Sequence, residues 1–282
     1  MDSLWISHPS LALIAGYCII CRHMAFSLLT YNVLYNKAFL QIEKILNKFK
    51  PDIICLQEVE TSGKNLGRLE KFGYKLADFS NSFITFGKIY GIATYFKPDK
   101  LKLIKSQSFY LPKSIYEMII TLKKILKGGS KPRTILRTHF LRNKKHVSIY
   151  NLHLSLQGIN RTRAKQLKII LEQSLESNDR PVIIIGDFNY LPYRRRGLEN
   201  LMKNYGFKEA TKKIYYTVRF PERKFAKYTL FQELILKMIR RIFTKKVKID
   251  YIFYKNLKLL NTKRINVEYS DHYPVISSFQ FT

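Results

Sequence analysis

The sequence predicts a single mixed α/β domain in which β-sheets pack face to face and helices lie outside. Short apolar runs of strand length alternate along the chain with segments whose apolar residues recur at helical spacing. No internal repeat and no linker rich in Pro, Gly or Ser divides the 282 residues, a length that can bury one full core. The hydrophobic share of 46% is that of a folded protein and excludes a disordered one.

In the first half of the chain, a β-rich run at 26–33 contains Asn32 near its end. The next apolar residues recur at helical spacing and predict a helix that ends before Pro51. They are Ile42, Ile45, Leu46 and Phe49. The continuous apolar run at 53–56 is typical of a strand covered on both faces, and Glu58 follows it. Further strands are predicted at 91–96, 102–109, 133–140 and 146–153.

In the second half, residues 161–175 read as a helix. Its apolar face consists of Leu167, Ile170, Leu171 and Leu175. Residues 182–185 predict another buried strand, followed by a turn at Gly186 and Asp187. The last predicted strands are 249–253 and 274–281.

The first 23 residues are expected to lie outside the fold, so that the domain spans residues 24–282. Met24 directly precedes the first strand and is interpreted as the natural start. The apolar run 11–20 is too short to span a membrane, and no Lys or Arg precedes it as in a signal peptide. We therefore expect a cytoplasmic protein. The alternative is that residues 1–23 form a weak N-terminal membrane anchor.

The three cysteines argue against a disulfide-stapled secreted scaffold. Cys18 and Cys21 form a C-x-x-C pattern, but no second pair follows at zinc-ligand spacing. Cys55 lies within an apolar run and is predicted to be a small core residue.

The chain carries 50 Lys and Arg against 20 Asp and Glu, a formal net charge of +30. Such an excess favours a polyanionic partner, either nucleic acid or an anionic phospholipid membrane. A lysine bias across the whole proteome is the alternative explanation. No obligate protein partner is inferred.

Four acids, Glu58, Asp187, Asp250 and Asp271, lie at or near predicted strand ends. Their hard oxygen ligands suit Mg²⁺ or Mn²⁺, which would neutralise charge on a phosphoryl group. Asp187 and Asn189 are two residues apart, so an extended backbone would point both side chains the same way, beside a phosphate and its attacking water.

His272 is the natural proton acceptor, with Asp250 available to set its tautomer. Taken singly, an Asp after a strand is more often a turn former, and His153 or Asn32 more often a local hydrogen bonder. Their joint occurrence in one order favours a phosphodiester-cleaving site.

Six short motifs in this order resemble the endonuclease/exonuclease/phosphatase family, the DNase I-like superfamily. They are LTYNV at 29–33, ICLQEV at 54–59, NLHL at 151–154, GDFN at 186–189, IDYIF at 249–253 and SDH at 270–272. The resemblance runs from about residue 26 to the C-terminus. It implies a four-layer α/β sandwich of two packed mixed β-sheets flanked by helices. It also implies hydrolysis of phosphodiester or phosphomonoester bonds with a divalent cation, usually Mg²⁺.

The resemblance also implies roles for individual residues. Glu58 would be the main metal ligand, and Asn32 and Asp271 would support the metal site. Asp187 would orient or deprotonate the attacking water, and Asn189 would hold the phosphate.

His272, paired with Asp250, would act in acid/base or phosphate-stabilising work. His153 occupies the position where DNase-like members place a histidine on the scissile phosphate. The motifs around Glu58 and Asp187 also resemble nocturnin-type RNA deadenylases, whereas 269–275 resembles uncharacterised prokaryotic members.

Three basic segments are candidates for tuning the substrate. Residues 212–248 contain an amphipathic basic pattern that would grip a phosphate backbone, lie on an anionic membrane, or simply pack as an outer helix. Residues 113–133 read as a basic surface loop. Arg194, Arg195 and Arg196 are a candidate phosphate clamp, or a solvated charge run.

The leading function is therefore a Mg²⁺-dependent nuclease or nucleic-acid end-processing phosphodiesterase. The alternative is a phosphodiesterase or phosphatase acting on lipid or inositol phosphate head groups at a membrane surface. The third hypothesis is a binding module that has kept the fold but has no catalytic activity.

Overall fold

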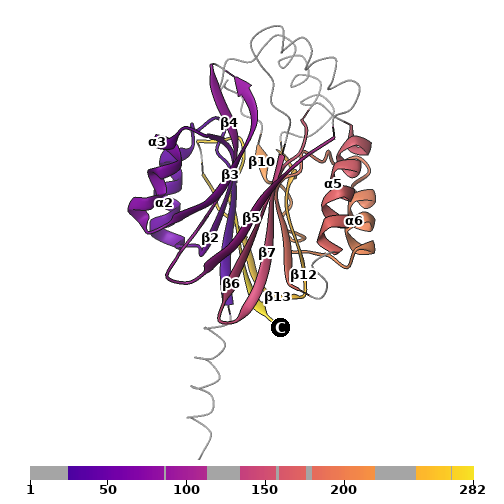
Figure 1. Ribbon diagram of the computed structural model, residues 1–282. Helices are drawn as coiled ribbons and strands as arrows, with labels where there is room; N and C mark the ends of the chain where they lie inside the picture. The colour runs from indigo at the N-terminus through magenta and orange to yellow at the C-terminus, as the bar shows by residue number, and fades with distance from the viewer. Residues whose placement is uncertain are drawn as a thin grey trace, which may run out of the picture.

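A computed structural model of the chain describes residues 25–85, 87–112, 134–156, 159–175, 180–219, 246–267 and 269–282. Within these ranges, two six-stranded β-sheets pack face to face (Figure 1). Outside one sheet lie α2 (Phe39–Phe49), α3 (Gly63–Leu66) and the 3₁₀ helix η1 (Gly67–Phe72). Outside the other lie α5 (Asn160–Leu175) and α6 (Arg195–Asn204).

The first sheet has the strand order β13-β14-β1-β2-β4-β3. These strands are β13 (Leu257–Arg264), β14 (Val275–Phe281), β1 (Ala25–Asn32), β2 (Ile53–Glu60), β4 (Lys88–Phe96) and β3 (Lys75–Thr85). Strands β1 and β2 are parallel, whereas every other pair of neighbouring strands in this sheet is antiparallel. The sheet is therefore mixed.

The second sheet has the strand order β5-β6-β7-β8-β12-β9. These strands are β5 (Lys102–Tyr110), β6 (Thr134–Arg142), β7 (Lys145–His153), β8 (Val182–Asp187), β12 (Asp250–Lys255) and β9 (Lys208–Glu209). Here β7–β8 is the parallel pair. A separate ribbon pairs β10 (Val218–Arg219) with β11 (Lys246–Val247).

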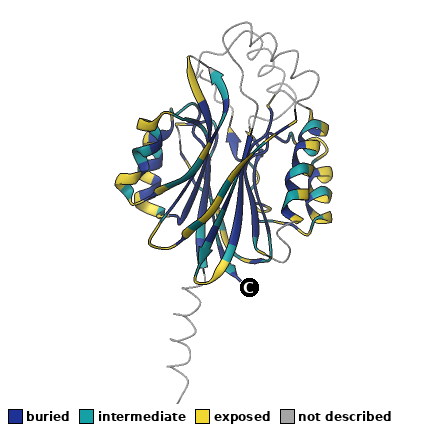
Figure 2. Cartoon of the chain, viewed as in Figure 1, coloured by how far each residue is buried: buried dark blue, intermediate teal, exposed yellow. Residues whose placement is uncertain are grey.

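Three hydrophobic clusters separate the layers and confirm the four-layer α/β sandwich. An inner cluster between the sheets draws on both, for example through Leu28 and Ile185. One outer cluster packs α2 on the first sheet, and the other packs α5 and α6 on the second. The buried residues accordingly concentrate where the sheets face each other and beneath the helices (Figure 2).

The alternation of strand side chains divides the residues between these clusters. In β8, Ile183 and Ile185 join the inner cluster, whereas Val182 and Ile184 join the outer one. Burial on both faces explains why this strand appears in the sequence as one continuous apolar run. Cys55, predicted as a core residue, is fully buried and free.

The structure differs from the predicted elements at a few points. Strands β3 and β13 were not predicted, because register shifts interrupt the two-residue period of each. Strand β8 continues through Asp187, so the turn predicted at Gly186 and Asp187 is wrong. Leu175, assigned to the buried face of its helix, is 49% exposed at the last position of α5.

Gly186 is required inside β8 by a close approach of two strands. Its φ is +138°, and a Cβ at this position would lie 2.1 Å from the carbonyl oxygen of Leu152 on β7. Any larger residue would push the parallel pair β7–β8 apart at the point where both strands end.

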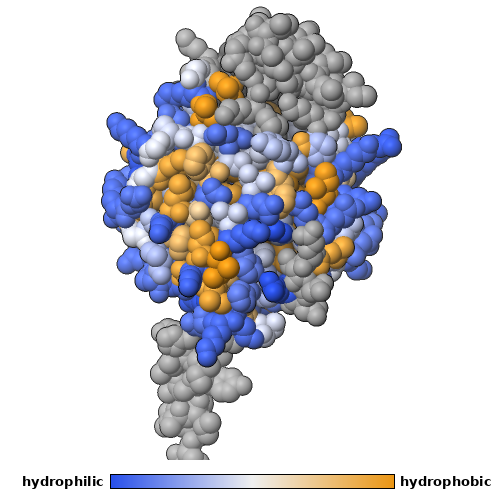
Figure 3. Space-filling model, in the orientation of Figure 1, coloured by the Kyte–Doolittle hydropathy of each residue, from blue (hydrophilic) through white to orange (hydrophobic). Residues whose placement is uncertain are grey.

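The edge strands β3 and β5 carry exposed apolar side chains, including Phe79 and Ile104. Hydrophobic residues also gather toward the middle of the face shown in Figure 3, with hydrophilic residues around them. The described residues contain no helix that is both long and apolar enough to cross a membrane.

Candidate active site

The topology brings all eight predicted site residues to one end of the sandwich. Strands β1, β2, β7 and β8 end there, and β12 begins there because it runs antiparallel to β8. Strand β14 starts just after His272 and ends beside the C-terminus, which marks the opposite end of the molecule (Figure 1). The eight residues are Asn32, Glu58, His153, Asp187, Asn189, Asp250, Asp271 and His272.

Strand register places three of these residues side by side. Asp187 is the Cα partner of His153 on β7 and of Asp250 on β12. All three are almost fully buried. The last residue of the middle strand β8, Asp187, therefore lies between His153 and Asp250.

Asp187 lies at the centre of the hydrogen bonds of the site. Its Oδ2 accepts from Asn32 Nδ2 at 3.1 Å and lies 3.4 Å from His153 Nε2. Its Oδ1 accepts from the backbone N–H of Asn189 at 2.9 Å. Burial raises the pKa of Asp187, against the opposing charge of His272.

His272 is held between two carboxylates. Its Nδ1 lies 2.9 Å from Asp250 Oδ2, and its Nε2 lies 3.8 Å from Asp187 Oδ2. Burial alone would lower the pKa of His272, but Asp250 and Asp187 together raise this pKa well above its ordinary value. The charged imidazolium is therefore the favoured form at neutral pH.

Two hydroxyl groups hold this part of the chain in place. Ser270 Oγ donates to the carbonyl oxygen of Asn32 at 3.0 Å and accepts from the backbone N–H of His272 at 3.1 Å. Thr217 Oγ1 accepts from the backbone N–H of Asp250 at 3.0 Å. Thr217 had no predicted role, because nothing in its local sequence indicates a contact with Asp250.

Glu58 enters the site through an irregularity in β2. The β2–β4 register shifts between Gln57 and Val59, and Glu58 itself has a left-handed φ of 58°. This is the geometry of a β-bulge, which redirects the side chain of the extra residue. As a result, Glu58 Oε1 lies 3.8 Å from His153 Nε2.

The second oxygen of Glu58 indicates a cation. Within the described residues, Oε2 is buried and has no hydrogen-bond partner. Burial and the nearby carboxylate of Asp271 raise the pKa of Glu58 to about 7. A divalent cation would satisfy the oxygen and compensate the clustered negative charge, so the donor set of Glu58, Asp271 and Asn32 fits Mg²⁺.

Asp187, Asp250 and His272 form a second group with metal-binding spacing, because one potential ligand atom of each lies within 4.8 Å of the others. The hydrogen bond between His272 and Asp250 already occupies Nδ1. Oxygen ligands also suit Mg²⁺ better than imidazole does. The Glu58 side is therefore the better candidate for a Mg²⁺ site.

Asn189 differs from the extended geometry expected from its spacing to Asp187. Its φ is 48°, and its Nδ2 donates to the carbonyl oxygen of Leu154 at 3.0 Å. Phe188, between Asp187 and Asn189, packs in the outer cluster. One of the two amide hydrogens of Asn189 is thus committed to the backbone carbonyl of Leu154.

An aromatic cluster that was not predicted lies next to His153. The ring of Phe83 on β3 packs edge-on against His153 at 6.2 Å between centroids and stacks on Tyr90 at 5.7 Å. Tyr35 packs edge-on against both Phe83 and Tyr90. Tyr35 lies in a run of three left-handed residues, 34–36, which is uncommon for residues other than glycine.

The candidate basic segments are only partly described. Residues 113–133 and 220–245 lie outside the described residues, as do residues 1–24. In the arginine run, Arg195 bonds Glu199 at 2.8 Å and Glu209 at 3.2 Å. Arg195 therefore has partners within the protein, which weakens its interpretation as a phosphate clamp.

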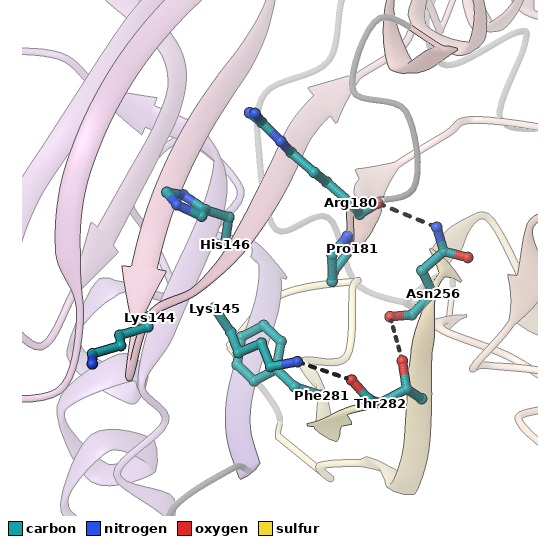
Figure 4. Close-up of a pocket in the computed structure, with 8 residues that line it drawn as sticks. All are labelled: Lys144, Lys145, His146, Arg180, Pro181, Asn256, Phe281 and Thr282. Atoms are coloured by element: carbon teal, nitrogen blue, oxygen red, sulfur yellow. Dashed lines mark hydrogen bonds between the residues drawn. The ribbon is translucent and has the colours of Figure 1, made fainter.

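A basic cavity of about 280 Å³ lies at the opposite end of the sandwich. It is lined by Lys144, Lys145, His146, Arg180, Pro181, Asn256, Phe281 and Thr282 (Figure 4). The side chains of Lys144 and Arg180 point in different directions, and Lys145 Nζ donates to Thr282 at 3.4 Å. This cavity shares no residue with the predicted site.

The chain is similar in fold to several solved structures. The human Nocturnin catalytic domain with bound sulfate is 19% identical, with a TM-score of 0.64 over 92% of this chain and 94% of that chain. D. rerio TDP2 complexed with single-strand DNA product is 16% identical, with a TM-score of 0.63 over 91% and 99%.

A Leptotrichia buccalis protein of the endonuclease/exonuclease/phosphatase family is 21% identical, with a TM-score of 0.64 over 91% of this chain and 100% of that chain. At these identities the likeness shows the fold alone. The sequence matches no curated protein.

Residues 29–272 match the model of the Endonuclease/Exonuclease/phosphatase family. The matched range contains every residue of the site, from Asn32 to His272, and covers most of the chain. The protein therefore belongs to the endonuclease/exonuclease/phosphatase family.

Proposed function

We propose that this protein is a Mg²⁺-dependent phosphodiester hydrolase acting on nucleic acid. One observation carries the proposal. His272 is held between Asp250 and Asp187 at the same end of the sandwich where Glu58 presents a buried, unpartnered oxygen. Such an arrangement supplies a fixed cation, a base and a metal ligand, which are the groups that phosphoryl transfer requires.

Glu58, Asp271 and Asn32 would hold Mg²⁺, or Mn²⁺ in its place. The bound metal would neutralise the negative charge that develops on the phosphoryl group. The remaining polar groups of the site perform the binding and the proton transfer.

Asp187 is the candidate base. The attacking water gives its proton to Asp187 while its oxygen bonds to phosphorus and the bond to the leaving oxygen breaks. Burial raises the pKa of Asp187, which brings it closer to the working pH of a general base. The hydrogen bonds from Asn32 and Asn189 hold this carboxylate in one orientation.

His272 is the candidate phosphate-stabilising cation. Because Asp250 accepts from Nδ1, the Nε2–H of the imidazolium faces Asp187 and the space where a phosphate would lie. His153, 3.4 Å from Asp187, would contact the scissile phosphate, and the uncommitted amide hydrogen of Asn189 would hold a phosphate oxygen.

Charge and aromatic content support nucleic acid as the substrate. The net charge of +30 favours a polyanion. The cluster of Tyr35, Phe83 and Tyr90 beside His153 would give an apolar flank for a nucleotide. The TDP2 structure contains a single-strand DNA product, and the Nocturnin structure contains a sulfate, an anion with the shape of phosphate.

Cleavage of end-labelled single- and double-stranded DNA and RNA by the full chain tests the proposal. We expect cleavage with Mg²⁺ that EDTA abolishes and that Asp187→Ala and His272→Ala each abolish. Intact DNA and RNA with both Mg²⁺ and Mn²⁺ would overturn nucleic acid as the substrate. Hydrolysis of inositol phosphates or phosphoinositide vesicles in the same assay would select the alternative substrate class.

A further inference from the structure

Along β2 and β7, the side chains that face the other sheet change from apolar to polar toward the end that carries the candidate active site. On β7, the inward side chains in order are Ile149, Asn151 and His153. On β2, Cys55 is followed inward by Gln57, and the bulge then brings in Glu58. An amide therefore lies between the apolar core and the candidate catalytic residue on each of these strands.

The two amides bond directly across the interior of the sandwich. Gln57 Nε2 donates to Asn151 Oδ1 at 2.8 Å, although the residues are 94 positions apart and belong to different sheets. Both side chains are fully buried. This hydrogen bond therefore joins the two sheets in a region that excludes water.

The remaining polar atoms of the pair are satisfied by β1, β2 and β4. Gln57 exchanges hydrogen bonds with Thr30 Oγ1 at 3.2 and 3.3 Å. Asn151 Nδ2 donates to the carbonyl oxygen of Ala93 at 3.1 Å and to Thr94 Oγ1 at 3.3 Å. We call Thr30, Gln57, Thr94 and Asn151 the amide layer.

The position of the amide layer relates it to the site. Gln57 directly precedes Glu58, and Asn151 precedes His153 by two residues on the same face of β7. A small slide of one sheet over the other would change the 3.8 Å separation of Glu58 Oε1 and His153 Nε2. Apolar contacts resist such a slide weakly, because dispersion has little directional preference, whereas a hydrogen bond has a narrow range of distance and angle.

We propose that the amide layer is a positioning device that sets the placement of Glu58 on the first sheet relative to His153 and Asp187 on the second. The inference rests on the proposed function, because it assigns these four residues to the geometry of that site. They contact neither metal nor substrate and act only through Glu58 and His153.

Paired substitutions separate positioning from simple stability. Gln57→Leu or Asn151→Leu alone leaves a buried polar group unpaired, so we expect a lower melting temperature and a lower kcat. The double variant removes both members of the pair, so its loss of melting temperature should be smaller than the sum of the two single losses, although Thr30 and Thr94 still lose a partner. Its kcat should stay about 100-fold below wild type with KM changed less than about threefold, as for a small misplacement of reacting groups. A folded double variant with wild-type kcat would overturn the proposal.

A milder variant covers the case in which the leucine substitutions do not fold. Thr30→Val removes the hydroxyl beside Gln57 and keeps the side-chain shape, and we expect kcat to fall about tenfold. Thr138→Val is the matched control, because Thr138 is equally buried on β6 and its hydroxyl has no hydrogen-bond partner within the described residues. Equal kcat for the two valine variants would contradict a positioning role.

Calorimetric titration with Mn²⁺ gives a readout that does not depend on turnover. The Leu/Leu double variant should bind Mn²⁺ about tenfold more weakly than wild type, because Glu58 is displaced. Unchanged Mn²⁺ affinity in the folded double variant would count against the amide layer. If wild type binds Mn²⁺ but hydrolyses no phosphodiester, the proposed function fails, while the Mn²⁺ affinities still decide the positioning role.

Discussion

The space between the two sheets has an apolar half and a polar half built from the same strands. On β8, Ile185 belongs to the apolar inner cluster, and Asp187, two residues later on the same face, is the centre of the candidate site. On β12, Ile252 and Asp250 show the same change. Both halves are buried, so burial alone does not distinguish them.

The difference shows how one scaffold separates stability from chemistry. In the apolar half, burial of isoleucine and phenylalanine contributes to folding. In the polar half, buried carboxylates lie near one another, and the pKa values of Glu58 and Asp187 are raised as a result. We expect the polar half to reduce stability and to supply the catalytic groups.

The largest expected effect is on turnover in the polar half. Asp187→Asn keeps the side-chain shape but removes the base, so we expect kcat to fall about 10³-fold without loss of stability. Single-turnover cleavage and thermal unfolding measure the two quantities. Asp99→Asn makes the same chemical change at an exposed position and should leave kcat unchanged. A variant at Asp187 that retained a tenth of wild-type activity would remove this residue from the mechanism.

The second effect belongs to the apolar half. Ile185→Ala removes a fully buried side chain, so we expect the free energy of unfolding to fall by about 2–5 kcal/mol. Ile185 is level with Asn151 in the β7–β8 register, but its apolar side chain makes none of the hydrogen bonds of the amide layer. We therefore expect kcat below the melting temperature to stay near wild type. Denaturant unfolding and steady-state kinetics test both expectations, and a large loss of kcat in the folded variant would show that the two halves are coupled.

A third prediction concerns the pH dependence of stability in the polar half. Glu58 has an ordinary pKa of 4.5 and a folded-state pKa of about 7. Between these values the folded protein holds a proton that the unfolded chain has released, so the stability from this group falls as pH rises. At pH 8 without metal, Glu58→Gln should therefore raise the free energy of unfolding by about 1–3 kcal/mol.

Denaturant unfolding at pH 5 and pH 8, with chelator and with Mg²⁺, measures this effect. Added Mg²⁺ should stabilise wild type and leave Glu58→Gln unchanged. A metal-free variant that is less stable than wild type at pH 8 would mean that Glu58 is not strained in the absence of a cation.

The smallest expected effect is a change in the free energy of unfolding at the outer surface, away from both halves of the interior. Arg195 pairs with Glu199 and Glu209, so Arg195→Ala should lower the free energy of unfolding by about 0.5–1 kcal/mol and leave KM for an oligonucleotide unchanged. The neighbouring exposed Arg196 offers a matched Arg196→Ala control. A KM that rises only for Arg195→Ala would restore the interpretation of Arg195 as a phosphate clamp.

Local patterns were sufficient for most of the architecture. Continuous apolar runs predicted the strands β2 and β8 because both of their faces are buried. Strands β3 and β13 escaped prediction because their register shifts interrupt the two-residue period. The direction of Glu58 was equally hidden, since strict alternation would turn it away from Gln57 and only the bulge brings it into the site.

By itself, the sequence predicted which residues are candidates for the chemistry, because a motif is a local order of residue types at strand ends. The tertiary structure alone decided how these residues meet. The bond from Asn32 to Asp187 joins positions 155 apart, and the bond from Ser270 to Asn32 joins positions 238 apart. No local pattern specifies such pairs, because they form only when two sheets with different strand orders pack at a definite relative position.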